Sequence, residues 1–217
     1  QMLLHEAFEA SCARLPAKTA IVCGDERISY GDLSARVDAL AALHAVDPAS
    51  VGLADYGKPG NYFERQLRRW AEQYRASETR PIAAMDALIA ALPARCPADD
   101  GAVALAHGDF RIDNLMFHRD EARVIAIVDW ELSTLGHPLA DLGYFCMALR
   151  LPRNPALPGL AGLDRAALGI PSEAELLALY AERSGRPIPE DWPFVLAFSF
   201  FRLAAIAQGV AKRAEQG

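Results

Sequence analysis

Three polar residues have the types and the spacing that phosphoryl transfer requires. Asp109 and Asn114 are separated by four residues in the segment HGDFRIDNLMF, residues 107–117, and Asp129 follows the apolar run 124–128. An aspartate carboxylate can accept a proton from an attacking hydroxyl. Amide and carboxylate oxygens are hard ligands that suit Mg²⁺. The set predicts Asp109 as the base, with Asn114 and Asp129 holding magnesium on the phosphates of ATP.

Two further residues are expected to support this site. His107 joins Asp109 as the second residue of the predicted catalytic pair, and its expected part is to brace the loop through hydrogen bonds. Asp141 lies near a predicted helix start, where its carboxylate could accept backbone N–H groups and hold the catalytic loop. Each residue alone has an ordinary explanation, because Asp and Asn favour turns and helix starts. The joint pattern favours the functional interpretation.

Several neighbouring residues have expected structural parts. Glu131 is expected to be an ordinary exposed carboxylate, although contact with a second metal stays open. Arg111 is expected either to face phosphates or to pair with an acid. Trp70, Trp130 and Trp192 are expected in the core rather than stacked on a ligand.

Short strands set among helices must position these residues, so the fold class is α+β and mainly α. Apolar spacing and turn residues predict both kinds of element. Helices are expected over residues 3–15, 32–44, about 62–74, about 82–92, 138–149, 172–183 and 191–214. Strands are expected over residues 19–23, 27–30, 103–106, 115–117 and 124–128. Ser29 with Asp32, and Ser172 with Glu175, resemble capping boxes that open two of the helices.

Composition limits the classes of partner. The chain has 217 residues, 52% of them hydrophobic, and a net charge of -6. This charge argues against nucleic acid and anionic membranes as partners. The four cysteines form no CxxC pair, so we expect free thiols in a reducing, cytoplasmic setting. The N-terminus has no signal-peptide pattern, and Arg202 interrupts the longest apolar stretch, 192–206. A small molecule is the expected partner, and the oligomeric state stays open.

The motif segments resemble the aminoglycoside phosphotransferase and choline kinase-like family. The resemblance rests on residues 107–117, on IVDWE (127–131) and on GHPLADL (136–142). The segments LHAVDP (43–48), GKPGNY (57–62), YFCM (144–147) and FRLAAI (201–206) are similar to the branch fused to certain acyl-CoA dehydrogenases. The likeness implies a protein-kinase-like C-terminal lobe with short hairpins around the catalytic loop. It also implies ATP and magnesium as cofactors and a small hydroxylated substrate.

The opening of the chain departs from that family. Such enzymes carry an N-terminal lobe with a phosphate-covering loop and a strand lysine, whereas this sequence has no GxGxxG and only three lysines. Residues 3–41 instead resemble the start of an adenylate-forming enzyme. We therefore expect a helix–hairpin segment over 1–42 in place of the N-lobe, joined to a kinase-like C-lobe over 43–217.

Three functions follow from these residues. The first is an ATP- and magnesium-dependent phosphotransferase with an alcohol group as acceptor, weakened by the missing N-lobe. The second is a catalytically inactive, pseudokinase-type binding domain with the same fold. The third is a metal-dependent hydrolase using His107, Asp109 and Asp129, which would want further ligands at metal spacing.

Overall fold

Helices make up most of the part of the chain that the structure describes. This computed structural model describes residues 21–23, 26–28, 33–118, 124–152, 159–165 and 170–216. The helices are α2 (Leu33–Ala45), α3 (Tyr62–Ser77), α4 (Ala83–Ala91), α5 (Pro138–Met147), α6 (Glu173–Ser184) and α7 (Trp192–Glu215). Three short 3-10 turns are η2 (Pro93–Arg95), η3 (Ile112–Asn114) and η4 (Trp130–Leu132). The expectation of a mainly helical chain is confirmed.

Pairs of short antiparallel strands connect the helices. The pairs are β1 (Ile21–Cys23) with β2 (Glu26–Ile28), β3 (Ala104–Ala106) with β6 (Thr134–Gly136), and β4 (Leu115–Phe117) with β5 (Val124–Ile127). The predicted strands before and after the catalytic loop are therefore confirmed. Strand β6 and its pairing with β3 were not predicted, because the two strands lie far apart in the sequence.

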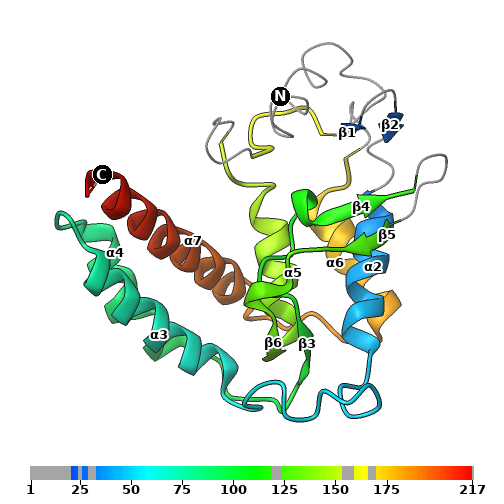
Figure 1. Cartoon of the computed structure of the whole chain (residues 1–217), viewed down its shortest axis with the longest axis horizontal. Coiled ribbons are helices and arrows are strands. Elements are labelled where there is room, and N and C mark those ends of the chain that lie inside the picture. Colours follow the sequence, from blue (N-terminus) through cyan, green and yellow to red (C-terminus); the bar gives the residue numbers. More distant parts are fainter. Residues whose placement is uncertain are drawn as a thin grey trace.

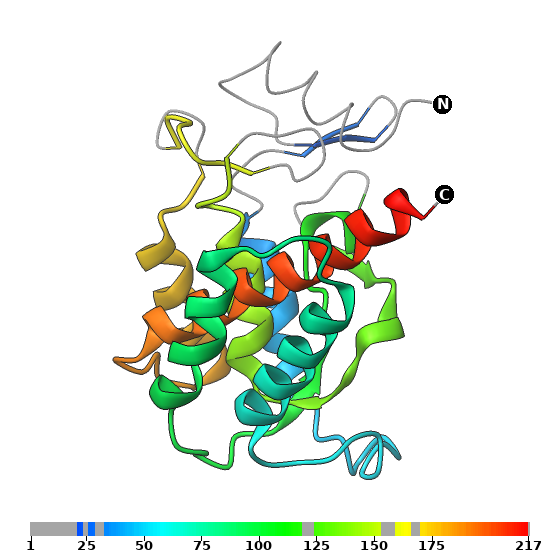
Figure 2. The same ribbon diagram turned by 90° about the vertical axis from the view of Figure 1, so that its left-hand side faces the viewer.

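Amphipathic helices enclose the core around the buried helix α5. All ten residues of α5 are buried, and α7 packs against both α5 and α3. Figures 1 and 2 show α7 lying along α3, while α2 and α6 pack together on the other side of α5. The predicted apolar face of α3 is buried, with Tyr74 fully enclosed. This packing brings parts of α2, α5 and α7 to the loop that follows β3.

Local sequence signals fix where two helices begin. Ser172 accepts a hydrogen bond from the Glu175 amide while the Glu175 carboxylate accepts one from the Ser172 amide, so the predicted capping box of α6 is confirmed. Pro138 occupies the first turn of α5, where no N–H is needed. His137 caps that helix, because its Nδ1 accepts from the Leu139 amide at 3.2 Å.

Helix α7 is long and apolar enough, by length and composition, to cross a membrane. Half of its most apolar window is buried in the protein, and it packs against α3 and α5. Its burial is greatest between Trp192 and Gln208, whereas Val210 is 52% exposed. We interpret α7 as a core helix whose last turns are exposed.

Some predictions concern residues outside the described part of the chain. The helix over 3–15 and the capping pair Ser29 and Asp32 belong to this group. The predicted hairpin is confirmed at β1 and β2, which pair with Ile21 opposite Ile28. The expected boundary between residues 42 and 43 falls inside α2, and the division into 1–42 and 43–217 stays a prediction.

Candidate functional site

A buried carboxylate holds the loop that follows β3. Asp141 of α5 is 1% exposed and accepts hydrogen bonds from the His107 amide at 2.6 Å and the Gly108 amide at 2.8 Å. Burial alone would raise the pKa of Asp141, but hydrogen bonds from His44, Gly108 and His107 hold that pKa below its usual value. The carboxylate is therefore charged and fixes the start of the catalytic loop.

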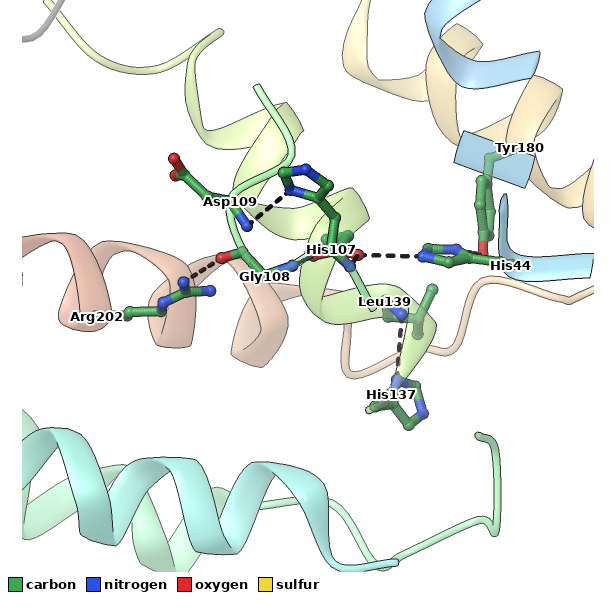
Figure 3. Close-up of polar contacts among 9 residues, drawn as sticks. His44, His107, Gly108, Asp109, His137, Leu139, Tyr180 and Arg202 are labelled. Atoms are coloured by element: carbon green, nitrogen blue, oxygen red, sulfur yellow. Dashed lines mark hydrogen bonds and ion pairs between the residues drawn. The ribbon is translucent and has the colours of Figure 1, made fainter. Parts of the chain in front are cut away.

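The His107 ring connects the loop to the end of β5. The Asp109 amide donates to His107 Nδ1 at 3.2 Å, so Nδ1 carries the lone pair. The other ring nitrogen, Nε2, then carries the proton and donates to the Val128 carbonyl at 2.9 Å. Both nitrogens are occupied by backbone groups, as a bracing residue requires. Figure 3 shows the contact with the Asp109 amide.

A second buried histidine reaches the same carboxylate from α2. His44 is 1% exposed, and its Nε2 lies 3.3 Å from Asp141 Oδ2. Its Nδ1 lies 2.8 Å from the hydroxyl of Tyr180 in α6 (Figure 3). Burial raises the pKa of Tyr180 to about 12, so this hydroxyl keeps its proton. Sequence reasoning did not assign His44 to the site, and its only signal was its place in the family-like segment 43–48.

Asp109 and Asn114 lie in direct contact. The Asn114 side-chain nitrogen donates to the Asp109 backbone oxygen at 2.8 Å and to its Oδ2 at 3.1 Å. Asn114 is 5% exposed, whereas the Asp109 side chain is 18% exposed. Because the amide nitrogen faces Asp109, the amide oxygen faces away from it and is available as a ligand.

The backbone brings Asp129 next to Asn114. The Val128 amide donates to the Asn114 carbonyl at 2.9 Å, and β4 pairs with β5 so that Leu115 lies opposite Ile127. Asp129 has φ 68° and ψ 60°, a left-handed conformation that is uncommon outside glycine. Its exposed side chain makes no capping hydrogen bond to η4. The carboxylate is thus available to a ligand.

The oxygen donors fit magnesium better than zinc. Asn114 and Asp129 offer one amide oxygen and one carboxylate, and Mg²⁺ commonly keeps several waters beside one or two such ligands. No group of three or more His, Cys, Asp or Glu side chains at metal-binding distance exists among the residues that the structure describes. Zinc would require such a group.

Three residues surround the Asp109 carboxylate and its loop. Arg111 Nε lies 3.4 Å from Asp109 Oδ2 and 3.8 Å from Asp113 Oδ2, with about half of the Arg111 side chain exposed. Burial, followed by the charge of Asp109, raises the pKa of Tyr144 to about 12. Arg202 of α7 donates to the Gly108 carbonyl (Figure 3). In the sequence, Arg202 stood out only as an interruption of an apolar stretch and as a member of the family-like segment 201–206.

The tryptophans divide between core and site. Trp70 and Trp192 are buried as expected. The expectation for Trp130 is wrong, because its side chain is 36% exposed and lies at the end of β5. Its indole donates to the Ile127 carbonyl at 2.8 Å, and its ring centre lies 4.8 Å from that of His107. Glu131 is exposed, as predicted.

Comparison with known proteins places this chain in a phosphotransferase family. The model of the phosphotransferase enzyme family matches residues 14–190. A candidate aminoglycoside phosphotransferase of Ralstonia eutropha JMP134 is 52% identical, with a TM-score of 0.83 over 88% of this chain and 59% of that chain. The macrolide 2'-phosphotransferase MphH of Brachybacterium faecium is 19% identical, with a TM-score of 0.52 over 85% of this chain and 58% of that chain, which shows a shared fold.

Curated relatives are much longer proteins. Acyl-CoA dehydrogenase family member 10 of Mus musculus is 48% identical over 179 residues, which are 82% of this chain and 17% of that protein. Acyl-CoA dehydrogenase family member 11 of Rattus norvegicus is 44% identical over 178 residues, 82% of this chain and 23% of that protein. The chain therefore spans about a fifth of the length of these relatives.

Proposed function

The chain belongs to the phosphotransferase enzyme family and has its kinase-like, mainly helical fold, and from this membership we propose that it is the catalytic lobe of an ATP- and magnesium-dependent kinase. The observation that carries the proposal is the contact of Asn114 with Asp109 beside the strand end that bears Asp129. One loop and one strand tip thereby supply a base and two hard oxygen ligands at the same place.

The residues divide the chemistry among them. Asp109 accepts the proton of the acceptor hydroxyl and orients it for attack. The amide oxygen of Asn114 and the carboxylate of Asp129 would hold magnesium, which when bound with ATP neutralises charge on the phosphates. His107 and Asp141 fix the loop through their hydrogen bonds to backbone groups, so that the base is held in place before the acceptor arrives.

An exposed apolar surface beside the site supports a dependence on further protein. Met116, Ile125, Val128 and Trp130 are 50%, 49%, 37% and 36% exposed on β4, on β5 and at the Asp129 corner. Exposed apolar side chains gathered in this way commonly mark an interaction site. We propose that a phosphate-gripping lobe covers this surface in the active enzyme.

We predict weak or no activity for these 217 residues, because their sequence does not reveal the strand lysine that the N-terminal lobe of such enzymes carries. Removing one positioned group from developing transition-state charge typically costs about 100- to 1000-fold in rate. Fusion of a complete N-terminal lobe with a phosphate-covering loop and a strand lysine should raise ATP turnover by about that factor. Equal turnover with and without the added lobe would refute this dependence.

The acceptor is proposed to be a small hydroxylated metabolite. The curated relatives carry the names of acyl-CoA dehydrogenases, which favours a hydroxyacyl compound over an antibiotic. A panel of hydroxyacyl-CoA thioesters, choline, homoserine and aminoglycosides, assayed by ADP release, tests this choice. Turnover that depends on aminoglycosides alone would overturn it.

The central test is a pair of substitutions on one loop. Asp109→Asn should abolish magnesium-dependent ADP release while ATP binding remains, because the amide cannot accept the proton. Asp113→Asn is the matched control, since Asp113 is a carboxylate on the same loop that also faces Arg111. Turnover that survives Asp109→Asn but not Asp113→Asn would place the base elsewhere.

One observation favours the second candidate, a binding domain without catalysis. Arg111 Nε already lies 3.4 Å from Asp109 Oδ2, where it competes with an acceptor hydroxyl for the same oxygen. Calorimetry with ATP and magnesium, combined with turnover, separates the two, because a binding domain binds without ADP release. The metal-dependent hydrolase is disfavoured, since both His107 nitrogens are engaged with backbone groups.

A further inference from the structure

Arg202 is a buried cation with an unusual set of neighbours. It lies in α7 with 4% of its surface exposed. The centre of its guanidinium lies 5.3 Å from the Trp70 ring centre and 4.9 Å from the Tyr144 ring centre. Its Nη2 donates to the Gly108 carbonyl, whereas its Nε is buried without a hydrogen-bond partner among the described residues.

This arrangement is costly for the folded protein. Within the described part of the chain Arg202 makes no ion pair with a carboxylate, and its guanidinium contacts two ring faces and a backbone carbonyl. Taking a charge out of water costs free energy, and an apolar side chain of similar volume would fill the same space without that cost. Packing alone therefore does not account for an arginine here, and its contact with Gly108 is the more informative feature.

That contact fixes one side of the peptide that precedes the proposed base. The Gly108–Asp109 peptide has its oxygen held by Arg202 and its N–H held by His107 Nδ1 at 3.2 Å. Gly108 has φ 82°, a region that glycine enters freely, so this peptide plane could otherwise rotate. The orientation of that plane determines the direction in which the Asp109 side chain leaves the loop.

We propose that Arg202 is a positioning residue of the phosphotransferase site, which locks the Gly108–Asp109 peptide and so aims the Asp109 carboxylate at the acceptor hydroxyl. The part played by Asp109 rests on the proposed function, whereas the locked peptide does not. Figure 3 shows the guanidinium approaching Gly108 from the side opposite His107. Helix α7 thereby contributes to the catalytic loop without touching the reacting atoms.

Amide hydrogen exchange tests the locked peptide directly. In Arg202→Met the Asp109 amide should exchange about tenfold faster or more, while amides in the middle of α5 keep their rates. Lys212→Met is the matched control, because Lys212 is a second α7 cation whose Nζ donates to a backbone carbonyl, that of Ala76, at 2.7 Å. The control should leave Asp109 exchange unchanged. An Asp109 rate within about twofold of the native rate in Arg202→Met overturns the proposal.

Kinetics test the consequence for the reaction. Arg202→Met should lower kcat about 10- to 100-fold and leave the KM for ATP within about twofold of the native value. The reason is that the Asp109 carboxylate loses its orientation, whereas the nucleotide still binds. Arg202→Lys should recover part of kcat, since it keeps a donor and the charge but loses the planar stacking. An unchanged kcat in the folded Met variant overturns the positioning role.

The two measurements separate this inference from the proposed function. If neither the native chain nor its fusion with the added lobe shows turnover with any acceptor, the proposed function fails, and hydrogen exchange still decides whether Arg202 locks the loop. If Arg202→Met does not fold, Arg202→Gln keeps a neutral polar group on a side chain too short to reproduce the contact. Unchanged Asp109 exchange in that folded variant would equally overturn the lock.

Discussion

Asp141→Asn is the substitution whose cost follows most directly from the geometry. The native carboxylate accepts from the His107 and Gly108 amides on different oxygens and faces His44 Nε2 at 3.3 Å. Asparagine keeps the volume of the side chain but offers one acceptor oxygen. Its NH₂ group then faces the His107 or the Gly108 amide, which is itself a donor. At least one buried N–H therefore loses its partner.

The expected magnitude is a large part of the total stability. A hydrogen bond to a charged group contributes about 1.5–3 kcal/mol, and an orphaned buried donor costs about 1–3 kcal/mol. With one such bond lost and the others weakened, we expect Asp141→Asn to lower the free energy of unfolding by about 3–5 kcal/mol. Domains of this size have only about 5–15 kcal/mol in total.

The loss should depend on pH in a defined direction. Burial opposes the charged form of Asp141, yet its hydrogen bonds lower its pKa in the folded protein. The unfolded chain then binds the proton more tightly, so the stabilisation is fully present above the ordinary Asp pKa of about 3.9. It disappears as the pH falls through the lower pKa of the folded state. The stability difference between native protein and variant should therefore narrow in acid.

Urea unfolding of both proteins at about pH 7 and about pH 3, followed by tryptophan fluorescence, measures this difference. The other carboxylates titrate in both proteins, so their contributions to the pH dependence cancel in the difference. Asp38→Asn is the control, because Asp38 pairs with Arg183 at 2.9 Å with about half of each side chain exposed. That pair should contribute at most about 1 kcal/mol. A loss for Asp141→Asn no larger than for the control, or one independent of pH, would refute the reasoning.

Three further predictions concern single residues. Gly108→Ala should lower the midpoint of thermal unfolding well below that of Gly162→Ala. Both glycines have φ near 80°, but of the two only Gly108 has a backbone carbonyl with which an added Cβ would clash. Equal midpoints would show that the loop relaxes around the methyl group. Addition of MgATP should change the tryptophan emission of the native chain, because Trp130 is exposed beside the proposed magnesium site. The same change in Trp130→Phe would show that the nucleotide does not bind next to residue 130. Ser172→Ala should cost about 1 kcal/mol in urea unfolding through loss of the capping box, and no loss would mean that water replaces the cap.

Residues close in the sequence allowed most of the site to be predicted. Asp109 and Asn114 lie five positions apart on one loop, so their contact follows from local turn geometry. Asp129 follows a strand whose hairpin partner begins directly after Asn114, and an apolar run identified that strand. The helix starts at Pro138 and Ser172 carry equally local signals.

Contacts between distant helices escaped prediction. His44 of α2 reaches Asp141, and Arg202 of α7 reaches Gly108 of the loop, from 97 and 94 residues away in the sequence. Their positions depend on how whole helices pack, which no periodicity specifies. Trp130 was misjudged for a related reason: its large apolar ring favours burial, yet it lies where β5 ends and no further element among the described residues covers it.

The link from His44 to Asp141 sets a condition on what can be joined upstream. His44 lies near the end of α2, and the predicted boundary between segments 1–42 and 43–217 falls in that helix. One inserted residue between Leu33 and His44 would turn everything before the insertion by about 100° relative to His44. Either His44 or the rest of α2 would then lose its register against α5 and α6. Recombination that keeps the number of residues in α2 unchanged can exchange the preceding segment and leave the catalytic loop intact. Insertion or deletion of a single residue within α2 cannot.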